Sequence, residues 1–496
     1  MGAILDLPVE LSSFLSRKPP QTLLIRGAPG TGKTTLALAL LRAFPGKRIY
    51  VTGRVSADEI SRDYPDFASN EAGGVTLVDD RQRGKGLASA AKALNAVHKL
   101  IADPNADEDL RSLLLPSEVL DAWSRSSSTE PVMVVLDSWD AIVEKHLGSR
   151  SATGDAPASR HDIERWLLDQ MNEGPVFTVI IVEDRKANHF EYLVNGIVTL
   201  DLQTTDDRPE RWLHIEKLRG VRIASPAYPF SLESARFRCA GHFDSQAPIH
   251  AGPLHPEPHH LPGTIWPGSQ EYAEFFGRPH IGRLTLVEKD HEVSDNAVRL
   301  VVAPLIASVL VNGGRTFGVL PPRLSPADVW RIFESVVPRD EFLRRVRLET
   351  TAPIDEEDEF HSIVLHDRTS TTGAVGHRTP DALRFLSEKQ DPTHPNLSVV
   401  WTSALQALDA REPGAYTPEN LPAIAQMYLR HAVMHMVIIG NPDDAFMDAV
   451  RPMAETRIAV SARNGRVFLH GIDPPTPNLL LSTGDSGSPF RLLRVV

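Results

Sequence analysis

The stretch GAPGTGKTT has the residue types and the spacing of a loop that cradles nucleotide phosphates. Its glycines let the backbone wind so that successive N–H groups point inward at phosphate oxygens. Lys33 would reach the β- and γ-phosphates, and the Thr34 hydroxyl would ligate Mg²⁺. The stretch therefore predicts a site for ATP and Mg²⁺, although nothing in it selects ATP over GTP. The predicted nucleotide-binding residues are Gly27, Pro29, Gly30, Thr31, Gly32, Lys33, Thr34 and Thr35.

The elements around this loop must position it, and their composition fits that task. The apolar run TLLI precedes the glycines, and TTLALALLRAF after them has helical composition. A second apolar run, PVMVVLDSWD, ends in Asp137, a carboxylate at a strand tip that would hold Mg²⁺ through water. Further strands are expected in KRIYVTG, GVTLVDD and FTVIIVEDR. Strands that alternate with helices predict an α/β fold with a parallel sheet.

The order of these motifs resembles the RecA-like ATPases of the KaiC/RadA group, from Gln21 to about Ala240. The most specific part is NGIVTLD followed by KLRG and YPF. In that family, the Lys and Arg of the KLRG strand reach the nucleotide of the neighbouring subunit. The resemblance implies that Lys217 and Arg219 are catalytic in trans, in a ring-like homo-oligomer such as a hexamer. A solvated edge strand with two basic residues is the alternative.

The chain departs from this family after its second strand. KaiC-like proteins have two consecutive glutamates there that activate the attacking water, whereas a gapless comparison places Arg54 and Val55 at these positions. Neither side chain can accept a proton from water, and Arg54 could counter phosphate charge. We therefore expect good nucleotide binding with slow or absent hydrolysis. Four other carboxylates could activate the water instead, Asp58, Glu59, Asp80 and Glu183, and spacing does not select among them. Glu183 is the candidate catalytic residue.

The second half repeats the pattern of the first without its chemistry. EKDHEVSD stands where GAPGTGKT stood, and its four carboxylates would repel phosphate. LSVVWTSAL matches VMVVLDSWD, with Thr402 in place of Asp137, and MHMVIIG matches FTVIIV. The fold prediction is two RecA-like parallel-sheet domains in tandem, the second without a P-loop. A chance alternation of strands and helices is the alternative. The predicted boundaries are 1–240 for the nucleotide domain, 241–282 for a Pro/His-rich linker and 283–496 for a pseudo-ATPase domain.

Three polar segments carry no specific prediction. The linker histidines His250, His255, His259 and His260 match no standard zinc spacing. The loop from His146 to Arg160 and the acidic run from Asp355 to Glu359 are interpreted as surface segments.

Composition limits the partners. A net charge of −12 does not favour a polyanion, so nucleic acid is not expected. The single cysteine, Cys239, excludes an intramolecular disulfide and fits a reducing compartment. The apolar stretch from Val301 to Val311 is too short for a bilayer, which needs about 20 residues. With no signal peptide recognised, a cytoplasmic protein without membrane association is expected.

These observations favour an ATP-dependent regulatory protein in which nucleotide controls self-assembly or the binding of an unidentified protein partner. Gas-vesicle regulators of the GvpD type share the single P-loop and the general plan, although no residue selects that pathway. A recombinase-like DNA-dependent ATPase is one alternative, which the acidic charge and the missing glutamates oppose. A scaffold with a structural nucleotide is the other.

Overall fold

A computed structural model describes most of the chain: residues 4–19, 21–65, 75–79, 131–141, 176–183, 190–246, 249, 261–350, 355, 357–365, 378–388, 394–414, 416–431, 434–483 and 490–496. Asp80, the loop 146–160 and the four linker histidines lie outside these residues. The chain divides into two compact domains. The N-terminal domain is Leu5–Cys239 with Val495–Val496, and the C-terminal domain is Ala240–Arg494 with Met1–Ile4.

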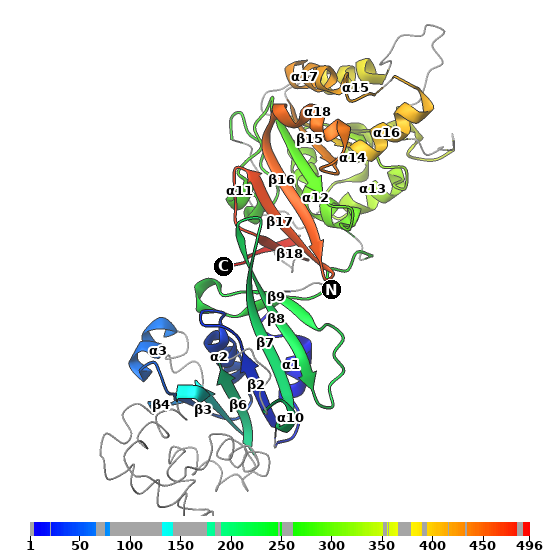
Figure 1. Cartoon of the computed structure of the whole chain (residues 1–496). Helices are drawn as coiled ribbons and strands as arrows, with labels where there is room; N and C mark the ends of the chain where they lie inside the picture. The colour runs from blue at the N-terminus through cyan, green and yellow to red at the C-terminus, as the bar shows by residue number, and fades with distance from the viewer. Residues whose placement is uncertain are drawn as a thin grey trace, which may run out of the picture. The chain divides into compact units, whose positions relative to one another are not determined.

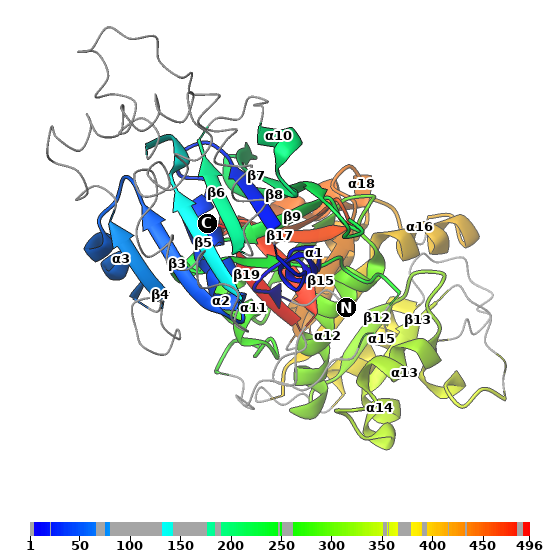
Figure 2. The ribbon, with the colours of Figure 1, turned by 90° about the horizontal axis from the view of Figure 1, so that it is seen from below.

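The N-terminal domain is built on a ten-stranded sheet in the order β1-β10-β9-β8-β7-β2-β6-β5-β3-β4. The six strands β7, β2, β6, β5, β3 and β4 pair in parallel with their neighbours. The pairings β7–β8, β8–β9 and β9–β10 are antiparallel. Figure 2 shows β6, β5, β3 and β4 in succession, with α3 beside the last two. The elements are β1 (Ile4–Leu5), α1 (Val9–Leu15), β2 (Gln21–Arg26), α2 (Lys33–Ala43), β3 (Lys47–Thr52), α3 (Ala57–Asp63), β4 (Val75–Asp79), β5 (Val132–Asp137), β6 (Val176–Val182), α10 (Phe190–Leu193), β7 (Gly196–Thr205), β8 (Arg208–Leu218), β9 (Ala227–Ser231), η4 (Glu233–Ala235) and β10 (Arg238–Ala240).

The core of this domain lies on both faces of the sheet. Alternate residues of β2, β5 and β6 belong to two separate apolar clusters, because successive strand side chains point to opposite faces. One cluster joins Leu23 and Ile25 to buried residues of α1 and α2, and the other contains Leu24 and Trp139. Every residue of β6 is buried, as expected for a parallel strand covered on both faces. Figure 1 shows α2 beside β2, the strand that leads into the P-loop.

The C-terminal domain has a nine-stranded sheet in the order β13-β12-β14-β15-β11-β16-β17-β18-β19. The strands from β13 to β16 run parallel, and the last three connections are antiparallel. The elements are α11 (Gln270–Phe276), β11 (Leu284–Lys289), α12 (Asp295–Val311), β12 (Thr316–Val319), α13 (Pro326–Phe333), α14 (Arg339–Arg345), β13 (Val346–Glu349), η5 (His361–Ile363), α15 (Arg378–Ser387), β14 (Asn396–Trp401), α16 (Thr402–Arg411), α17 (Leu421–His431), β15 (Met434–Gly440), α18 (Ala445–Val450), η6 (Arg451–Met453), β16 (Ala454–Arg463), β17 (Arg466–Asp473), β18 (Leu479–Thr483) and β19 (Phe490–Arg494).

The two sheets share one topology. The nine strands β2 to β10 of the first sheet can be matched one to one, in chain order, with β11 to β19 of the second. Matched strands then lie in the same order across the two sheets. The registers also agree: Leu24 pairs with Ile180 in the first sheet, and Leu286 pairs with Ile438 in the second. Each sheet has a register shift in its first antiparallel pair, between Ile197 and Val198 and between Arg457 and Ile458. The prediction of two RecA-like α/β domains in tandem is therefore confirmed.

The register corrects two predicted equivalences by one residue each. Because α2 begins at Lys33 and α12 at Asp295, Gly27 corresponds to Lys289 rather than to Glu288. Glu288 itself is buried in β11 with Arg457, so it does not belong to the loop. In the same way, Trp401 rather than Thr402 occupies the position of Asp137.

The segment predicted as a linker contains regular structure. Helix α11 begins after Ser269, whose hydroxyl accepts a hydrogen bond from the Tyr272 N–H. Ile265, Tyr272 and Phe276 are buried in the core of the C-terminal domain. The Pro- and Gly-rich composition hid this short helix. None of the helices in the described part of the chain is both long and apolar enough to cross a membrane.

Candidate nucleotide-binding site

The predicted phosphate loop connects the end of β2 to the first residue of α2. Gly30 and Gly32 have φ values of 78° and 99°, which L-residues rarely adopt. A Cβ atom on Gly27 would lie 2.5 Å from the Leu200 carbonyl oxygen, and one on Gly32 would lie 2.8 Å from the Leu232 side chain. The glycines are thus required by close approach as well as by backbone winding.

Lys33 is folded over the loop that it follows. Its buried ammonium group donates hydrogen bonds to the carbonyl oxygens of Gly27, at 2.7 Å, and Ala28, at 2.9 Å. These two acceptors hold the cation inside the loop, where it faces the space that phosphate oxygens would enter.

The two predicted magnesium ligands meet in space. The Thr34 hydroxyl donates a hydrogen bond of 2.7 Å to the Asp137 carboxylate, although 103 residues separate them. The Tyr50 hydroxyl, on β3, donates to the same carboxylate oxygen. Burial, together with the negative charge of Asp137, raises the pKa of Tyr50 well above its usual value, so it stays a donor. A hydroxyl and a carboxylate side by side are oxygen ligands that suit Mg²⁺.

A pocket opens beside these groups at the carboxyl ends of β3, β5 and β6. Residues of the P-loop line one part of it, and residues of α3, together with Tyr64 after that helix, line another. The Thr35 and Tyr64 hydroxyls lie 3.2 Å apart at one edge. The lining residues are Pro29, Gly30, Gly32, Lys33, Thr34, Thr35, Tyr50, Thr52, Arg54, Val55, Ile60, Asp63, Tyr64, Asp137, Ser138, Glu183 and Leu232.

Arg54 and Glu183 form an ion pair in the wall of this pocket. Arg54 follows β3 and Glu183 follows β6, so both lie at the edge of the sheet that carries the P-loop. Two other predicted substitutes are elsewhere: Glu59 caps α3 by accepting hydrogen bonds from Ser56, and Asp58 does not line the pocket. Among the described carboxylates, Glu183, Asp63 and Asp137 do line it.

Lys217 and Arg219 lie at the opposite end of the sheet. Lys217 pairs with Ile197, and the backbone N–H of Arg219 donates to Asn195, which lies level with Thr22 at the start of β2. Their side chains donate to the carbonyl oxygens of Glu191 and Tyr192. Burial, followed by the charge of Arg219, lowers the pKa of Lys217. Within one chain, therefore, neither residue lines the pocket.

Comparison with known proteins agrees with this geometry. Residues 11–218 match the family model described as "GvpD gas vesicle protein, P-loop domain". The N-terminal domain is therefore similar to the P-loop domain of that family. The protein GvpD2 of Halobacterium salinarum is 25% identical over 98% of this chain and 95% of its own length. GvpD1 of the same organism is 29% identical over 47% of this chain and 41% of its own length.

A KaiC-like protein of Pyrococcus horikoshii has a structure similar to part of the chain. It is 20% identical, with a TM-score of 0.30, over 44% of this chain and 88% of its own. The predicted similarity to GvpD-type proteins is confirmed by the family model and by GvpD2. The GvpD match spans the P-loop, Asp137, Glu183 and Lys217, and it ends before Arg219.

Several pocket residues of the N-terminal domain were missed by sequence reasoning. Tyr50, Thr52, Asp63, Tyr64 and Leu232 belong to no motif. Tyr50 and Thr52 could have been found, because alternate residues of a strand share a face and β3 was predicted. Leu232 could not, since it reaches Gly32 from a segment 200 residues further along the chain.

Proposed function

We propose that the N-terminal domain binds Mg-ATP, that the nucleotide controls self-assembly or the binding of a protein partner, and that hydrolysis is slow or absent. The observation that carries the proposal is the arrangement around the P-loop. Lys33, Thr34 and Asp137 are in place to bind a nucleotide, and Glu183, another carboxylate that lines the pocket, is engaged by Arg54.

Binding is supported by the chemistry of each group. The Lys33 ammonium would exchange its two carbonyl partners for phosphate oxygens, a stronger, charge-assisted interaction. When bound, Mg²⁺ would neutralise phosphate charge, and Thr34 and Asp137 would hold it directly or through water. The exposed tip of the loop at Pro29 and Gly30 leaves the cradle open to a ligand.

Slow turnover is supported by what faces the phosphates. General-base catalysis needs an acceptor within hydrogen-bond reach of the attacking water. Arg54 has no acceptor atom, and its guanidinium occupies one Glu183 oxygen. Asp137 already accepts hydrogen bonds from Thr34 and Tyr50. The pocket therefore favours holding a nucleotide over cleaving it.

Control of assembly is supported by the distance between the basic pair and the P-loop of the same chain. Arg219 lies level with Thr22 of β2, which is five residues before Gly27, or roughly 17 Å at about 3.3 Å per residue. We propose that Lys217 and Arg219 reach the nucleotide of an adjacent copy, so that the nucleotide joins two subunits.

The binding test is a titration of the full chain with a fluorescent ATP analogue and Mg²⁺. Lys33→Ala should weaken binding about 10- to 100-fold, since a hydrogen bond to a charged group contributes about 1.5–3 kcal/mol. Lys47→Ala is the matched control, because Lys47 is exposed at the start of β3 and should bind as the unmodified chain does. Equal affinity of both variants would refute the assignment of the site.

The turnover test measures phosphate release under the same conditions. We expect less than about 1 turnover per minute, where typical enzymes reach about 10 per second. A faster, Mg²⁺-dependent rate that disappears in Lys33→Ala would overturn the proposal of slow hydrolysis and leave that of binding intact.

A further inference from the structure

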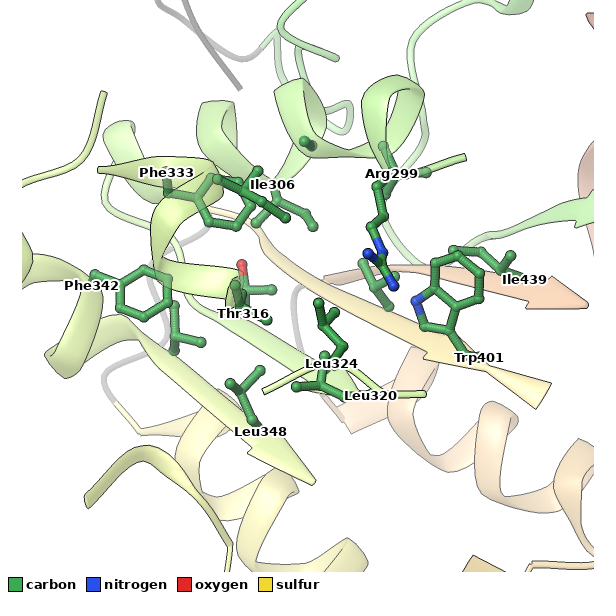
Figure 3. A pocket seen from close by; sticks show the side chains of 17 residues that line it. Arg299, Ile306, Thr316, Leu320, Leu324, Phe333, Phe342, Leu348, Trp401 and Ile439 are labelled. Atoms are coloured by element: carbon green, nitrogen blue, oxygen red, sulfur yellow. The ribbon is translucent and has the colours of Figure 1, made fainter. Parts of the chain in front are cut away.

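The C-terminal domain contains a cavity between its sheet and the helices α12, α13 and α14 (Figure 3). Its volume is about 60 Å³. The walls are aliphatic and aromatic side chains, among them Ile306, Phe333 and Leu348, and the polar side chains on them are those of Arg299 and Thr316. Figure 3 shows Arg299 extending from α12 toward Trp401, with Phe333 and Phe342 on the far side of Thr316.

This cavity corresponds to part of the nucleotide pocket of the first domain. The sheet registers place Gly318 at the position of Tyr50 and Trp401 at that of Asp137. Helices α3 and α13 begin with the same capping box, at Ser56 and Ser325. Counted from these caps, the polar side chain of Asp63 corresponds to Ile332, and Tyr64 corresponds to Phe333. The same region has therefore become apolar, and it has no phosphate loop.

Two positions that line the cavity carry smaller residues than their counterparts in the first domain. Tyr50 and Leu41 are fully buried in the first domain. Their counterparts are Gly318 and, counted from the starts of α2 and α12, Ala303, and both line the cavity. Interiors normally pack without voids larger than a water molecule. The cavity is thus a local feature of the second domain that its own core residues do not fill.

Arg299 gives the cavity a chemical preference. Its Nε has no hydrogen-bond partner, and the Thr316 hydroxyl has none either. The nearest carboxylate oxygen to the guanidinium, from Asp295, is 3.9 Å away, and Asn296 accepts one bond at 3.0 Å. Burial lowers the pKa of Arg299, whereas the charges of Asp295 and Asp328 raise it. The unpartnered Nε–H of Arg299 is stabilised by an acceptor placed in the cavity, and a carboxylate accepts the stronger, charge-assisted hydrogen bond.

We propose that this cavity binds a short-chain monocarboxylate, with its carboxylate on Arg299 and its apolar tail in the space beside Gly318. The volume equals that of about two water molecules in the liquid, which limits the tail to a few carbons. A nucleotide is too large and too polar for this site. The second domain would then be a ligand-binding domain derived from a nucleotide-binding one.

The test is a chain-length series, from acetate through butanoate to octanoate, titrated into the full chain and followed by NMR. Each added methylene that enters the cavity should raise the affinity about fourfold, until the tail no longer fits. Butan-1-ol should bind at least tenfold more weakly than butanoate, because it lacks the charge that Arg299 recognises. Affinity independent of chain length, or equal binding of the alcohol, would overturn the proposal.

Two variants locate the site. Gly318→Ala places a Cβ 3.1 Å from the Leu348 side chain, so the new methyl group and the displaced Leu348 side chain narrow the space, and butanoate binding should fall at least tenfold. Because alanine also suits a strand interior better than glycine, its melting temperature should not fall, which separates loss of binding from unfolding. Arg299→Met should abolish the preference for butanoate over the alcohol.

Matched controls keep the result decisive. Arg331→Met removes an exposed arginine from α13 and should change neither binding nor stability. If Gly318→Ala unfolds the domain, Ala303→Leu fills the same cavity from α12 and serves in its place. If a folded cavity-filling variant and folded Arg299→Met both bind butanoate as the unmodified chain does, this site is excluded. ATP binding by the first domain should be unaffected throughout, so the outcome is independent of the proposed ATP-dependent function.

Discussion

Arg54 lines the nucleotide pocket, and its ion pair with Glu183 makes a direct prediction possible. Arg54→Gln would leave both Glu183 oxygens free to accept a proton from water. Phosphate release should then rise about 100-fold, the lower end of the 10²- to 10⁴-fold range that general-base catalysis supplies. The measurement is single-turnover hydrolysis of Mg-ATP.

Two further variants define that result. Adding Glu183→Gln to Arg54→Gln should return hydrolysis to the original rate, since no carboxylate would remain at that position. Arg62→Gln removes an exposed arginine from α3 outside the pocket and should leave the rate unchanged. A rate that rises equally in the double variant would show that Glu183 is not the base.

Buried His435 predicts a pH dependence of stability in the C-terminal domain. Its ring is buried between the His280 carbonyl oxygen and the Thr285 hydroxyl, and burial lowers its pKa to about 4. Its unfolded pKa is about 6.5, so the folded domain binds this proton less readily. Stability from neutral His435 is complete above pH 6.5 and is lost as pH falls toward 4, by about 3 kcal/mol in total.

Denaturant unfolding of the full chain between pH 7 and pH 4 measures this loss. Phe177 occupies the corresponding position in the first domain. His435→Phe should therefore fit the sheet and flatten the pH dependence, although the Thr285 hydroxyl loses a partner. An unchanged slope between pH 6.5 and 4 in this variant would assign the dependence to other groups.

At the scale of elements, the two capping boxes allow matched substitutions. Ser325 accepts a hydrogen bond from the Asp328 N–H while the Asp328 carboxylate accepts one from the Ser325 N–H, and Ser56 and Glu59 do the same. Ser325→Ala should cost about 1 kcal/mol of stability in the C-terminal domain. Ser56→Ala should cost a similar amount in the first domain and also weaken nucleotide binding, because α3 forms a wall of that pocket.

Thermal unfolding of both variants, with and without Mg-ATP, tests this difference. Ser61→Ala is a control on α3, because its hydroxyl bonds only within the helix, to the Ala57 carbonyl oxygen. Equal ATP affinity in Ser56→Ala and the unmodified chain would mean that α3 does not shape the site.

Element identity was predictable from sequence, but residue register was not. The apolar runs of β2, β5, β6 and β15 and the helix after the P-loop follow directly from composition and period. The equivalences of Thr402 and Glu288 were wrong by one residue, because an apolar run does not fix where strand pairing begins. Only hydrogen-bonded partners settle that point, and a slip of one residue reverses the face of a side chain.

The candidate site was predictable where a motif is local and not where distant segments meet. Gly27 to Thr35 and Asp137 were found because their spacing carries chemistry. Tyr50, Tyr64 and Leu232 join the pocket through the order of the strands and the packing of α3, which no local pattern encodes. The cavity beside Gly318 could not be predicted either, because it becomes evident only when Gly318 and Ala303 are compared with Tyr50 and Leu41, the larger residues at the same positions of the first domain.

At the scale of the whole molecule, one P-loop and a remote basic pair predict assembly that depends on nucleotide. Light scattering coupled to size exclusion should show a larger species with Mg-ATP than without it. The double variant Lys217→Ala/Arg219→Ala should bind ATP with about the same affinity, because neither residue lines the pocket of its own chain, yet it should not assemble. Arg208→Ala, at the opposite end of β8, should assemble normally.

Mixing experiments extend this prediction to the role in trans. Lys33→Ala supplies intact Lys217 and Arg219 but stays empty at ATP concentrations that saturate only the double variant, which holds nucleotide but lacks the basic pair. If the pair reaches across the interface, the two variants should form a complex together with Mg-ATP, although each alone remains monomeric. A ring requires every interface to be complete, so the mixture should stop at dimers. A monomer in every mixture and at every nucleotide concentration would refute assembly through Lys217 and Arg219.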